Sequence, residues 1–159
     1  MKKIDPKAPI TPQLAEWPVL YVEDEPSNWE VTELRLRKKY KLLWAKSDLE
    51  AVGIVKQFSG QFLAVLMDVQ LKGSVLDGIK LTQLFRGKLP ASEVPAYAKD
   101  LPLVKCPVFF VTAYGNLYTP QQMTEAGGDG HVPKPVDFLK LTLTLAETSA
   151  KRALQTLEK

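Results

Sequence analysis

The residues of this chain that are best suited to chemistry stand directly after short apolar runs. Asp68 follows the apolar run 62–67, whose length is typical of a strand buried on both faces of a parallel sheet. Glu23 and Asp24 follow a second such run, Val19–Val22. Because ligands bind beyond the carboxyl ends of parallel strands, these three acids are predicted to lie at the functional edge of a sheet.

Two further strand-like runs end in a hydroxyl and an amine. Thr112 follows the run 108–111, and Lys134 follows the run 130–133. Two carboxylates held ~4 Å apart repel each other by about 4 kcal/mol at an effective dielectric of about 20. Such a cluster can take up a proton, draw in Lys134 or bind a cation, and hard oxygen ligands suit Mg²⁺. Asp68 could then attack phosphorus and form an acyl phosphate, since carboxylates do serve as nucleophiles.

Strand and helix signals alternate from residue 19 onward, which predicts an α/β fold. Strands are expected over residues 19–22, 41–45, 62–67, 108–111 and 130–133. Helices are expected after Pro26, the capping box of Ser47 and Glu50, Asp77, the cap formed by Thr119 and Pro120, and Asp137. The alternation predicts a doubly wound five-stranded parallel sheet of strand order 2-1-3-4-5, with helices on both faces.

The segment after Asp137 contains a local conflict. Leu141, Leu143 and Leu145 alternate as in a strand, but strong helix-forming residues dominate onward to the end of the chain. We therefore predict a helix to about residue 158, which would be ~30 Å long. This exceeds what the sheet needs, so the end of the helix could serve a partner or a dimer.

The chain divides into an N-terminal extension, residues 1–17, and one domain, residues 18–159. The extension holds three prolines and no clear period, so we expect an extended arm that packs through Leu14 and Trp17. Within the domain, the connection over about residues 86–106 is long and also holds three prolines.

The composition excludes several classes of protein. A chain of 159 residues that is 45% hydrophobic can fill one core, and a net charge of +3 gives no support for nucleic-acid binding. No apolar stretch approaches the ~20 residues of a membrane helix. Cys106 is the only cysteine, so no intrachain disulfide can form. Together with the absence of an apolar signal segment, this favours the cytoplasm.

Four motifs occur in one order along the chain, each at an expected strand end. They are VLYVEDEPSN (19–28), VLMDVQLKGSVLDG (65–78), PVFFVTAYG (107–115) and AGGDGHVPKPVD (126–137). In this order the chain resembles the response-regulator receiver domains of two-component signalling, in their single-domain form. The resemblance covers the chain from residue 19 to about 154. It implies a flavodoxin-like fold, Mg²⁺ as cofactor, and a phosphorylated signalling module rather than an enzyme.

The resemblance implies a role for each residue of the acidic cluster. Asp68 matches the phosphoacceptor aspartate. Asp24 matches the acid that binds Mg²⁺ directly, and Glu23 the acid that holds it largely through water. Gln70 matches the position whose backbone carbonyl completes the metal site.

The resemblance also implies how the phosphoryl group is held and sensed. Lys134 matches the lysine that pairs with the phosphoryl oxygens, and its bond to Pro135 is usually cis in the family. Thr112 matches the hydroxyl that turns toward the phosphoryl group, and Ala113 the small residue that leaves the pocket open. His131 stands where the family usually has a Tyr or Phe that moves inward on activation. A partly buried histidine holding one hydrogen bond is the alternative interpretation of His131.

Four features depart from the family pattern. Glu23 replaces the commoner Asp, and His131 replaces the aromatic switch residue. The loop 71–76 and the segment 86–106 are both longer than usual. The last two features alter surfaces next to the site, so they bear on the choice of partner.

These roles together predict a phosphorylation-dependent switch. A histidine kinase or a histidine phosphotransfer protein would donate the phosphoryl group to Asp68. No DNA-binding module is expected within residues 1–159, so we expect the output to come from contacts with an unknown protein or a homodimer, from onward phosphate relay, or from a domain outside this sequence. One alternative is a phosphatase or phosphotransferase of the haloacid-dehalogenase type, but that type usually has an acid where this chain has Gln70. Another is a receiver-like scaffold that takes no phosphate, which would not need the intact acids, hydroxyl and lysine.

Overall fold

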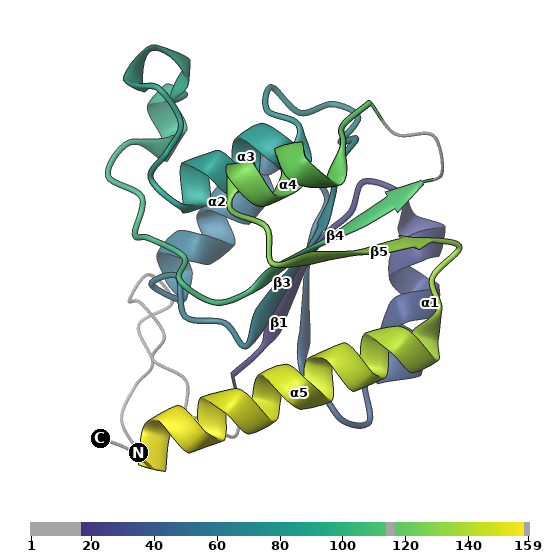
Figure 1. The fold of residues 1–159 in the computed structure, drawn as a ribbon. Coiled ribbons are helices and arrows are strands. Elements are labelled where there is room, and N and C mark those ends of the chain that lie inside the picture. The colour runs from purple at the N-terminus through teal and green to yellow at the C-terminus, as the bar shows by residue number, and fades with distance from the viewer. Residues whose placement is uncertain (1–16, 114–116, 158–159) are drawn as a thin grey trace, which may run out of the picture.

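A parallel sheet forms the middle layer of the protein and separates two groups of helices (Figure 1). The computed structural model describes residues 17–113 and 117–157. The strands are β1 (Val19–Val22), β2 (Leu42–Ala45), β3 (Ala64–Asp68), β4 (Val108–Ala113) and β5 (Gly130–Lys134). The helices are α1 (Pro26–Leu36), α2 (Asp48–Gln57), α3 (Gly78–Phe85), α4 (Pro120–Ala126) and α5 (Phe138–Leu157).

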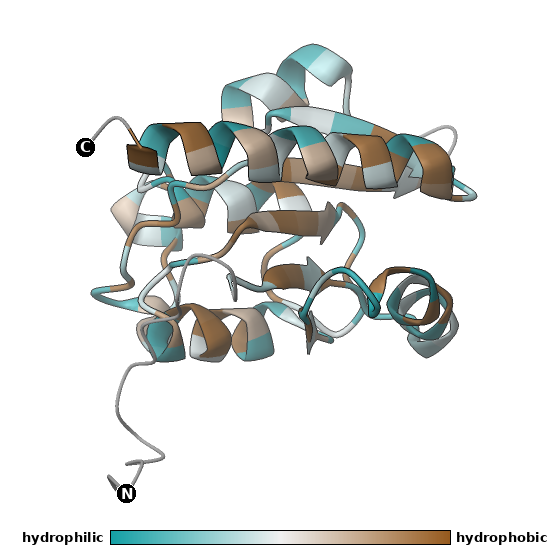
Figure 2. Cartoon of the chain, turned by 90° about the horizontal axis from the view of Figure 1, so that it is seen from below, coloured by the Kyte–Doolittle hydropathy of each residue, from teal (hydrophilic) through white to brown (hydrophobic). Residues whose placement is uncertain are grey.

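The strands pair in parallel in the order β2-β1-β3-β4-β5, which confirms the predicted topology. The three central strands β1, β3 and β4 are buried along almost their whole length, because helices cover both faces of the sheet. In Figure 2 the strands of the sheet are mostly brown, the colour of hydrophobic residues, whereas the helices carry mixed colours. Because helices cover both faces of the sheet, these strands appear in the sequence as continuous apolar runs.

Each face of the sheet has its own hydrophobic core. Alternate residues of one strand point to opposite faces, so Leu66 and Met67 of β3 belong to different cores. One core packs against α2, α3 and α4, and the other packs against α1 and α5. Burying one large apolar side chain such as Phe110 stabilises the fold by about 1.5–3 kcal/mol. The sheet is therefore a firm base for the residues at its edge.

Side chains cap α2, α3, α4 and α5 where the sequence predicts these helices to begin, whereas α1 begins without a side-chain cap. The hydroxyl of Ser47 accepts a hydrogen bond at the start of α2, and Asp77 caps α3. Thr119 forms the expected capping box with Gln122 at the start of α4. Asp137 accepts a hydrogen bond from the backbone of the first turn of α5. These caps fix the residue at which each of the four helices begins, next to the edge of the sheet where the predicted site residues lie.

The segment 86–106 is ordered against the face that carries α2 and α3. It contains two short 3-10 turns, Ala91–Glu93 and Ala96–Ala98. In Figure 1 much of it projects beyond the helices as the teal loop at the upper left. Several of its apolar side chains join the core on that face: Leu89, Ala98, Val104 and Cys106 are buried there.

The two ends of the chain are described only in part. Residues 1–16, including Leu14, and residues 158–159 lie outside the described part. The ring of Trp17 packs on the core beneath α5, and the guanidinium of Arg152 lies 3.2 Å from its centroid. The helical prediction for the last segment is confirmed as far as Leu157. None of the helices in the described ranges has the length and apolar character needed to cross a bilayer.

Candidate functional site

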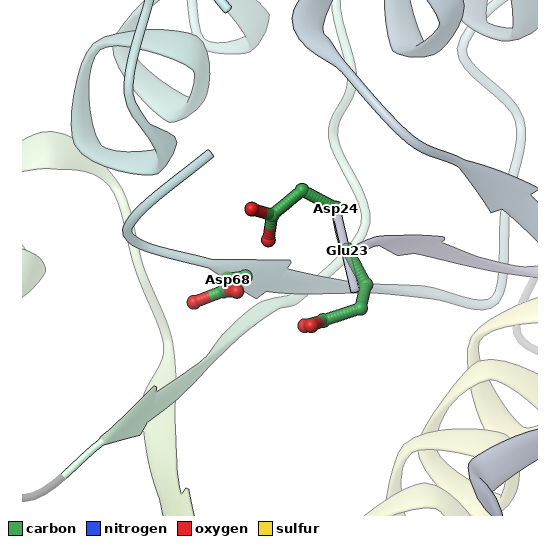
Figure 3. Close-up of side chains that lie close together, drawn as sticks. All are labelled: Glu23, Asp24 and Asp68. Carbon is green, nitrogen blue, oxygen red and sulfur yellow. The ribbon is translucent and has the colours of Figure 1, made fainter. Parts of the chain in front are cut away.

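Three carboxylates come together at the carboxyl ends of β1 and β3. Glu23 and Asp24 follow β1, and Asp68 is the last residue of β3. One oxygen from each of these carboxylates lies within 4.8 Å of the others. Figure 3 shows the side chains of Glu23 and Asp24 leaving the chain on different sides, with both carboxylates near that of Asp68. The strand ends therefore assemble the acidic cluster that the sequence predicts.

Glu23 is entirely buried, so its position is fixed by its neighbours. Its Oε1 accepts a hydrogen bond of 2.8 Å from Nδ2 of Asn28 in the first turn of α1. Its backbone carbonyl accepts a 2.7 Å hydrogen bond from Nε1 of Trp44 on β2. The ring of Trp44 stacks on that of Trp29, with centroids 5.2 Å apart. Contacts from α1 and β2 thus hold the end of β1 in place.

Lys134 supplies a positive charge to two of the acids. Its Nζ lies 3.1 Å from Oε2 of Glu23 and 3.1 Å from Oδ2 of Asp68. Burial by itself would lower the pKa of Lys134, but the charges of Asp68 and Glu23 outweigh burial and raise that pKa above its ordinary value. Lys134 therefore stays charged, and it compensates carboxylates that would otherwise be costly to bury.

The pKa of Asp68 is subject to opposing effects from its surroundings. It is 6% exposed, and burial together with the charge of Glu23 raises its pKa to about 7, although Lys134 acts in the other direction. In the metal-free protein this carboxyl group therefore exchanges its proton near neutral pH. A strongly shifted acid at a strand end is typical of a functional site.

A close approach of two backbone segments fixes the chain just beyond Asp68. The N–H of Gly78, the first residue of α3, donates a 2.8 Å hydrogen bond to the carbonyl of Val69. A Cβ at position 78 would lie 2.0 Å from the backbone oxygen of Asp68. Only glycine fits there, so Gly78 allows α3 to start directly against the end of β3.

The loop between β3 and α3 also contacts the acidic cluster. The backbone N–H of Lys72 donates a 3.0 Å hydrogen bond to Oδ2 of Asp24. Gln70 lies on the same loop with its side chain exposed. Only its backbone is required by the predicted metal site, so this exposure is compatible with the prediction.

The ends of β4 and β5 bring the remaining predicted residues to the same edge. Thr112 is buried and pairs in register with Pro133, and the exposed Ala113 pairs with Lys134. The peptide bond between Lys134 and Pro135 is cis, as predicted.

His131 lies farther back on β5. It pairs in register with Phe110, two residues before the pairing of Thr112. Its side chain is exposed. The interpretation of His131 as a partly buried histidine is therefore wrong, because β5 is the edge strand of the sheet and turns this side chain to solvent.

Several side chains that support the site have no clear signal in the sequence. Asn28 stands five residues after Glu23 at a helix start, a spacing that could have pointed to its contact. Trp44 reaches Glu23 across 21 positions of sequence, so only the pairing of β1 with β2 brings the two together. The hydroxyl of Tyr118 donates a 2.5 Å hydrogen bond to Oδ2 of Asp77, and this contact also spans two distant segments.

Comparison with known proteins agrees with this geometry. The family model for the response regulator receiver domain matches residues 19–146. The transcriptional regulatory protein ZraR of Klebsiella oxytoca is 28% identical over 137 residues, which cover 86% of this chain. The chain spans only 27% of the length of that relative.

Two solved receiver domains show the same fold. The receiver domain of Ssk1 from Saccharomyces cerevisiae, solved with the histidine phosphotransfer protein Ypd1, is 26% identical with a TM-score of 0.68. The match covers 87% of this chain and 92% of that one. The receiver domain of the sensor histidine kinase PA1611 from Pseudomonas aeruginosa, solved with magnesium in its active-site cleft, is 24% identical with a TM-score of 0.64. That match covers 86% of this chain and 99% of the other, and at this identity it concerns the fold alone.

The family match spans most of the chain, including every strand and the whole acidic cluster. This match favours a phosphoacceptor domain over a phosphatase of the haloacid-dehalogenase type. Such a phosphatase would also need a second acid at position 70, where this chain has Gln70. The chain belongs to the response regulator receiver domains of two-component signalling, which are phosphoacceptor modules rather than enzymes.

Proposed function

We propose that this receiver domain is a phosphorylation-dependent switch in which Asp68 accepts a phosphoryl group from a phosphohistidine when Mg²⁺ is bound. The observation that carries the proposal is the cluster of Glu23, Asp24 and Asp68 with Lys134 against it. This arrangement unites a carboxylate nucleophile, oxygen ligands for a cation and a fixed ammonium group at one sheet edge.

The donor set fits magnesium. Carboxylate oxygens of Glu23, Asp24 and Asp68 lie within 4.8 Å of one another, and Mg²⁺ prefers a few carboxylates together with water. Asp24 and Asp68 would hold the ion directly, Glu23 largely through water, and the carbonyl of Gln70 would complete the set. When bound, the ion would neutralise charge on the phosphoryl oxygens. The magnesium in the active-site cleft of the Pseudomonas receiver domain supports this assignment.

Asp68 would act as the nucleophile of the transfer. One of its carboxylate oxygens forms a bond to phosphorus while the bond between phosphorus and the donor imidazole nitrogen breaks. The imidazole leaves with the electron pair of that bond. Lys134 already lies 3.1 Å from Asp68, so it could pair with the incoming phosphoryl oxygens without a large movement. Ala113 would leave room for the phosphoryl group because its side chain is a single methyl.

Phosphorylation would be sensed at the ends of β4 and β5. The hydroxyl of Thr112 would turn toward the phosphoryl group, and new contacts worth about 1.4 kcal/mol would change the ratio of two conformations tenfold. His131 is exposed in this structure, so a switch role would require it to move inward. Its neutral form would then be favoured, since burying an imidazolium near Lys134 would be costly.

A histidine kinase or a histidine phosphotransfer protein would supply the phosphoryl group. The complex of the Ssk1 receiver domain with Ypd1 supports the second type of partner. Output would pass through protein contacts or a homodimer. Leu139 and Leu143 of α5 are 72% and 56% exposed and one helical turn apart, so they offer an apolar contact for either.

The proposal is tested by incubating the protein with Mg²⁺ and acetyl phosphate and then measuring its intact mass. We expect one phosphoryl group per chain, lost when EDTA replaces Mg²⁺ and lost in Asp68→Asn. Glu25→Gln is the matched control, because Glu25 is an exposed acid next to the cluster and should not affect the adduct. A wild-type protein that forms no adduct, with acetyl phosphate or with a phosphorylated histidine phosphotransfer protein, would refute the proposed function.

A further inference from the structure

Asp48, a buried carboxylate away from the acidic cluster, collects hydrogen bonds from three separate segments. It is 3% exposed and is the first residue of α2. Its Oδ1 accepts a 2.8 Å bond from the N–H of Leu49 in its own helix. Its Oδ2 accepts 3.0 Å bonds from the N–H groups of Val75 and Leu76, and a 2.6 Å bond from the hydroxyl of Tyr97.

Most of these contacts lie outside the helix to which Asp48 belongs. Ser47 already caps α2 by accepting a hydrogen bond from the N–H of Glu50, so Asp48 is not needed for that purpose. Burial alone would raise the pKa of Asp48. The bonds from Tyr97, Leu76, Leu49 and Val75 outweigh burial and hold that pKa below its ordinary value. The carboxylate is therefore ionised and well satisfied, and it binds segments other than its own.

One of those segments is the loop that leads from Asp68 to α3. The backbone N–H of Asp48 donates a 3.0 Å hydrogen bond to Oγ of Ser74, so three consecutive loop residues are fastened to the start of α2. The side chain of Val75 is 76% exposed, and a Cβ at Gly73 would meet nothing within 4 Å. Between the buried Leu71 and Leu76, residues 72–75 have little packing of their own, so their position depends on the hydrogen bonds to Asp24 and Asp48.

The same loop contacts the acidic cluster on its other side. Lys72, two residues before Ser74, donates its backbone N–H to Oδ2 of Asp24. Gln70, whose carbonyl is the proposed metal ligand, lies two residues farther back. The loop is thus held between Asp24 at one end and Asp48 at the other, with few residues in between to absorb a displacement.

Tyr97 links this loop to the segment 86–106. Its hydroxyl binds Asp48, and its backbone carbonyl accepts a 2.7 Å hydrogen bond from Nζ of Lys56 on α2. Its ring packs against the core beneath. The 3-10 turn that carries Tyr97 is therefore fixed on α2 at the point where α2 holds the loop.

We propose that Asp48 and Tyr97 are positioning residues for the metal site, so that the segment 86–106 sets the affinity of this receiver domain for Mg²⁺. The proposal rests on the proposed function, because it assumes that Asp24, Asp68 and Gln70 bind the ion. Asp48 itself touches neither the ion nor the phosphoryl group. It acts through the loop, and Tyr97 acts through Asp48.

The test is a Mg²⁺ titration of the 159-residue wild type, of Asp48→Asn and of Tyr97→Phe, in which binding is followed by amide NMR shifts. Tyr97→Phe removes one hydroxyl, and we expect it to weaken Mg²⁺ binding about threefold. Asp48→Asn removes the charge and leaves a single acceptor oxygen for the four donors that Asp48 now serves, and we expect about tenfold weaker binding. Glu93→Gln is the matched control, because Glu93 is on the same segment but pairs with Lys80 and not with the loop.

Two further measurements separate positioning from a general loss of stability. Hydrogen exchange at the amides of Val75 and Leu76 should accelerate in both Asp48→Asn and Tyr97→Phe. Exchange at the amides in the core of β3 should keep its wild-type rate. At saturating Mg²⁺ the rate of phosphorylation by acetyl phosphate should return to the wild-type value. If Asp48→Asn fails to fold, Tyr97→Phe carries the same test alone.

The outcomes distinguish the two proposals. If wild type and Tyr97→Phe bind Mg²⁺ equally well, or if Glu93→Gln weakens binding as much, the positioning role is refuted and the phosphoacceptor assignment stands. If high Mg²⁺ does not restore the phosphorylation rate, the positioning role is refuted as well. If wild type shows no response to Mg²⁺, the metal assignment fails and this inference fails with it.

Discussion

Replacing Asp68 with Asn should stabilise the metal-free protein at mildly alkaline pH. Asp68 is buried against Glu23, and its pKa is raised from 3.8 to about 7. A group whose pKa is raised in the folded state contributes stability that is present below its unfolded pKa and is lost as pH rises through its folded pKa. The contribution of Asp68 should therefore decline between about pH 4 and about pH 7. Asn has nearly the same shape and carries no charge, so it should remove this decline.

The magnitude follows from the size of the shift. Each pKa unit corresponds to about 1.4 kcal/mol, so the shift sets an upper bound of about 4 kcal/mol at pH values well above 7. The shift already includes the attraction of Lys134, and the effective dielectric around such a buried site is well above that of a dry interior, so the upper bound is not reached. We therefore expect Asp68→Asn to raise the free energy of unfolding by about 1–3 kcal/mol at about pH 8 and by much less at about pH 5.

Urea unfolding in EDTA, followed by tryptophan fluorescence at several pH values, measures this difference. The wild type should lose stability relative to Asp68→Asn as pH rises, and added Mg²⁺ should narrow the gap because it binds the wild type more tightly than the variant, which lacks one of the carboxylates. Glu25→Gln, the same change at a neighbouring exposed acid, should track the wild type. Parallel stability curves for wild type and Asp68→Asn would show that burial and Glu23 do not penalise the charge of Asp68, and the electrostatic argument would then be wrong.

Three further changes test other contacts of the site and its supports. Lys134→Met should lower the free energy of unfolding in EDTA by about 3–5 kcal/mol at about pH 8, because Glu23 and Asp68 would remain buried without their partner. Urea curves at about pH 5 should show a smaller loss, since Asp68 is then protonated. Gly78→Ala should lower the midpoint of urea unfolding by more than an exposed helix substitution does, because its Cβ would lie 2.0 Å from the oxygen of Asp68. Arg86→Met should cost about 2–3 kcal/mol, measured by thermal unfolding, because that guanidinium binds two backbone carbonyls and a carboxylate across separate segments.

The sheet and the acidic cluster could be predicted from the sequence because both follow from local patterns. Short apolar runs identify buried parallel strands, and the residue after each run then falls at a known edge of the sheet. Asp68 and Lys134 lie 66 positions apart, yet each ends a strand, so their contact needed no further information. The caps of α2, α3 and α4 were likewise predictable, since a side chain three residues from its partner amide is a local feature.

The supports of the site could not be predicted in this way. Tyr97 contacts Asp48 across 49 positions of sequence, and Trp44 contacts Glu23 across 21. In neither pair do both residues stand at the ends of predicted strands. Side-chain contacts of this kind depend on how the helices and loops pack on the sheet, which no periodicity encodes. The exposure of His131 was also missed, because alternation within a strand does not tell whether an edge strand is covered.

Asp48 and Asp68 show why residue type alone does not separate a structural acid from a chemical one. Both are aspartates that are almost fully buried, and burial alone would raise the pKa of each. Asp48 receives hydrogen bonds from three backbone amides and a tyrosine hydroxyl, so its charge is stabilised and its pKa falls. Asp68 faces Glu23 as well as Lys134, so its pKa rises to about 7. The first arrangement holds segments together, and the second leaves the charge of a buried carboxylate only partly compensated by Lys134, which is the arrangement expected of a group that takes up a proton or a cation.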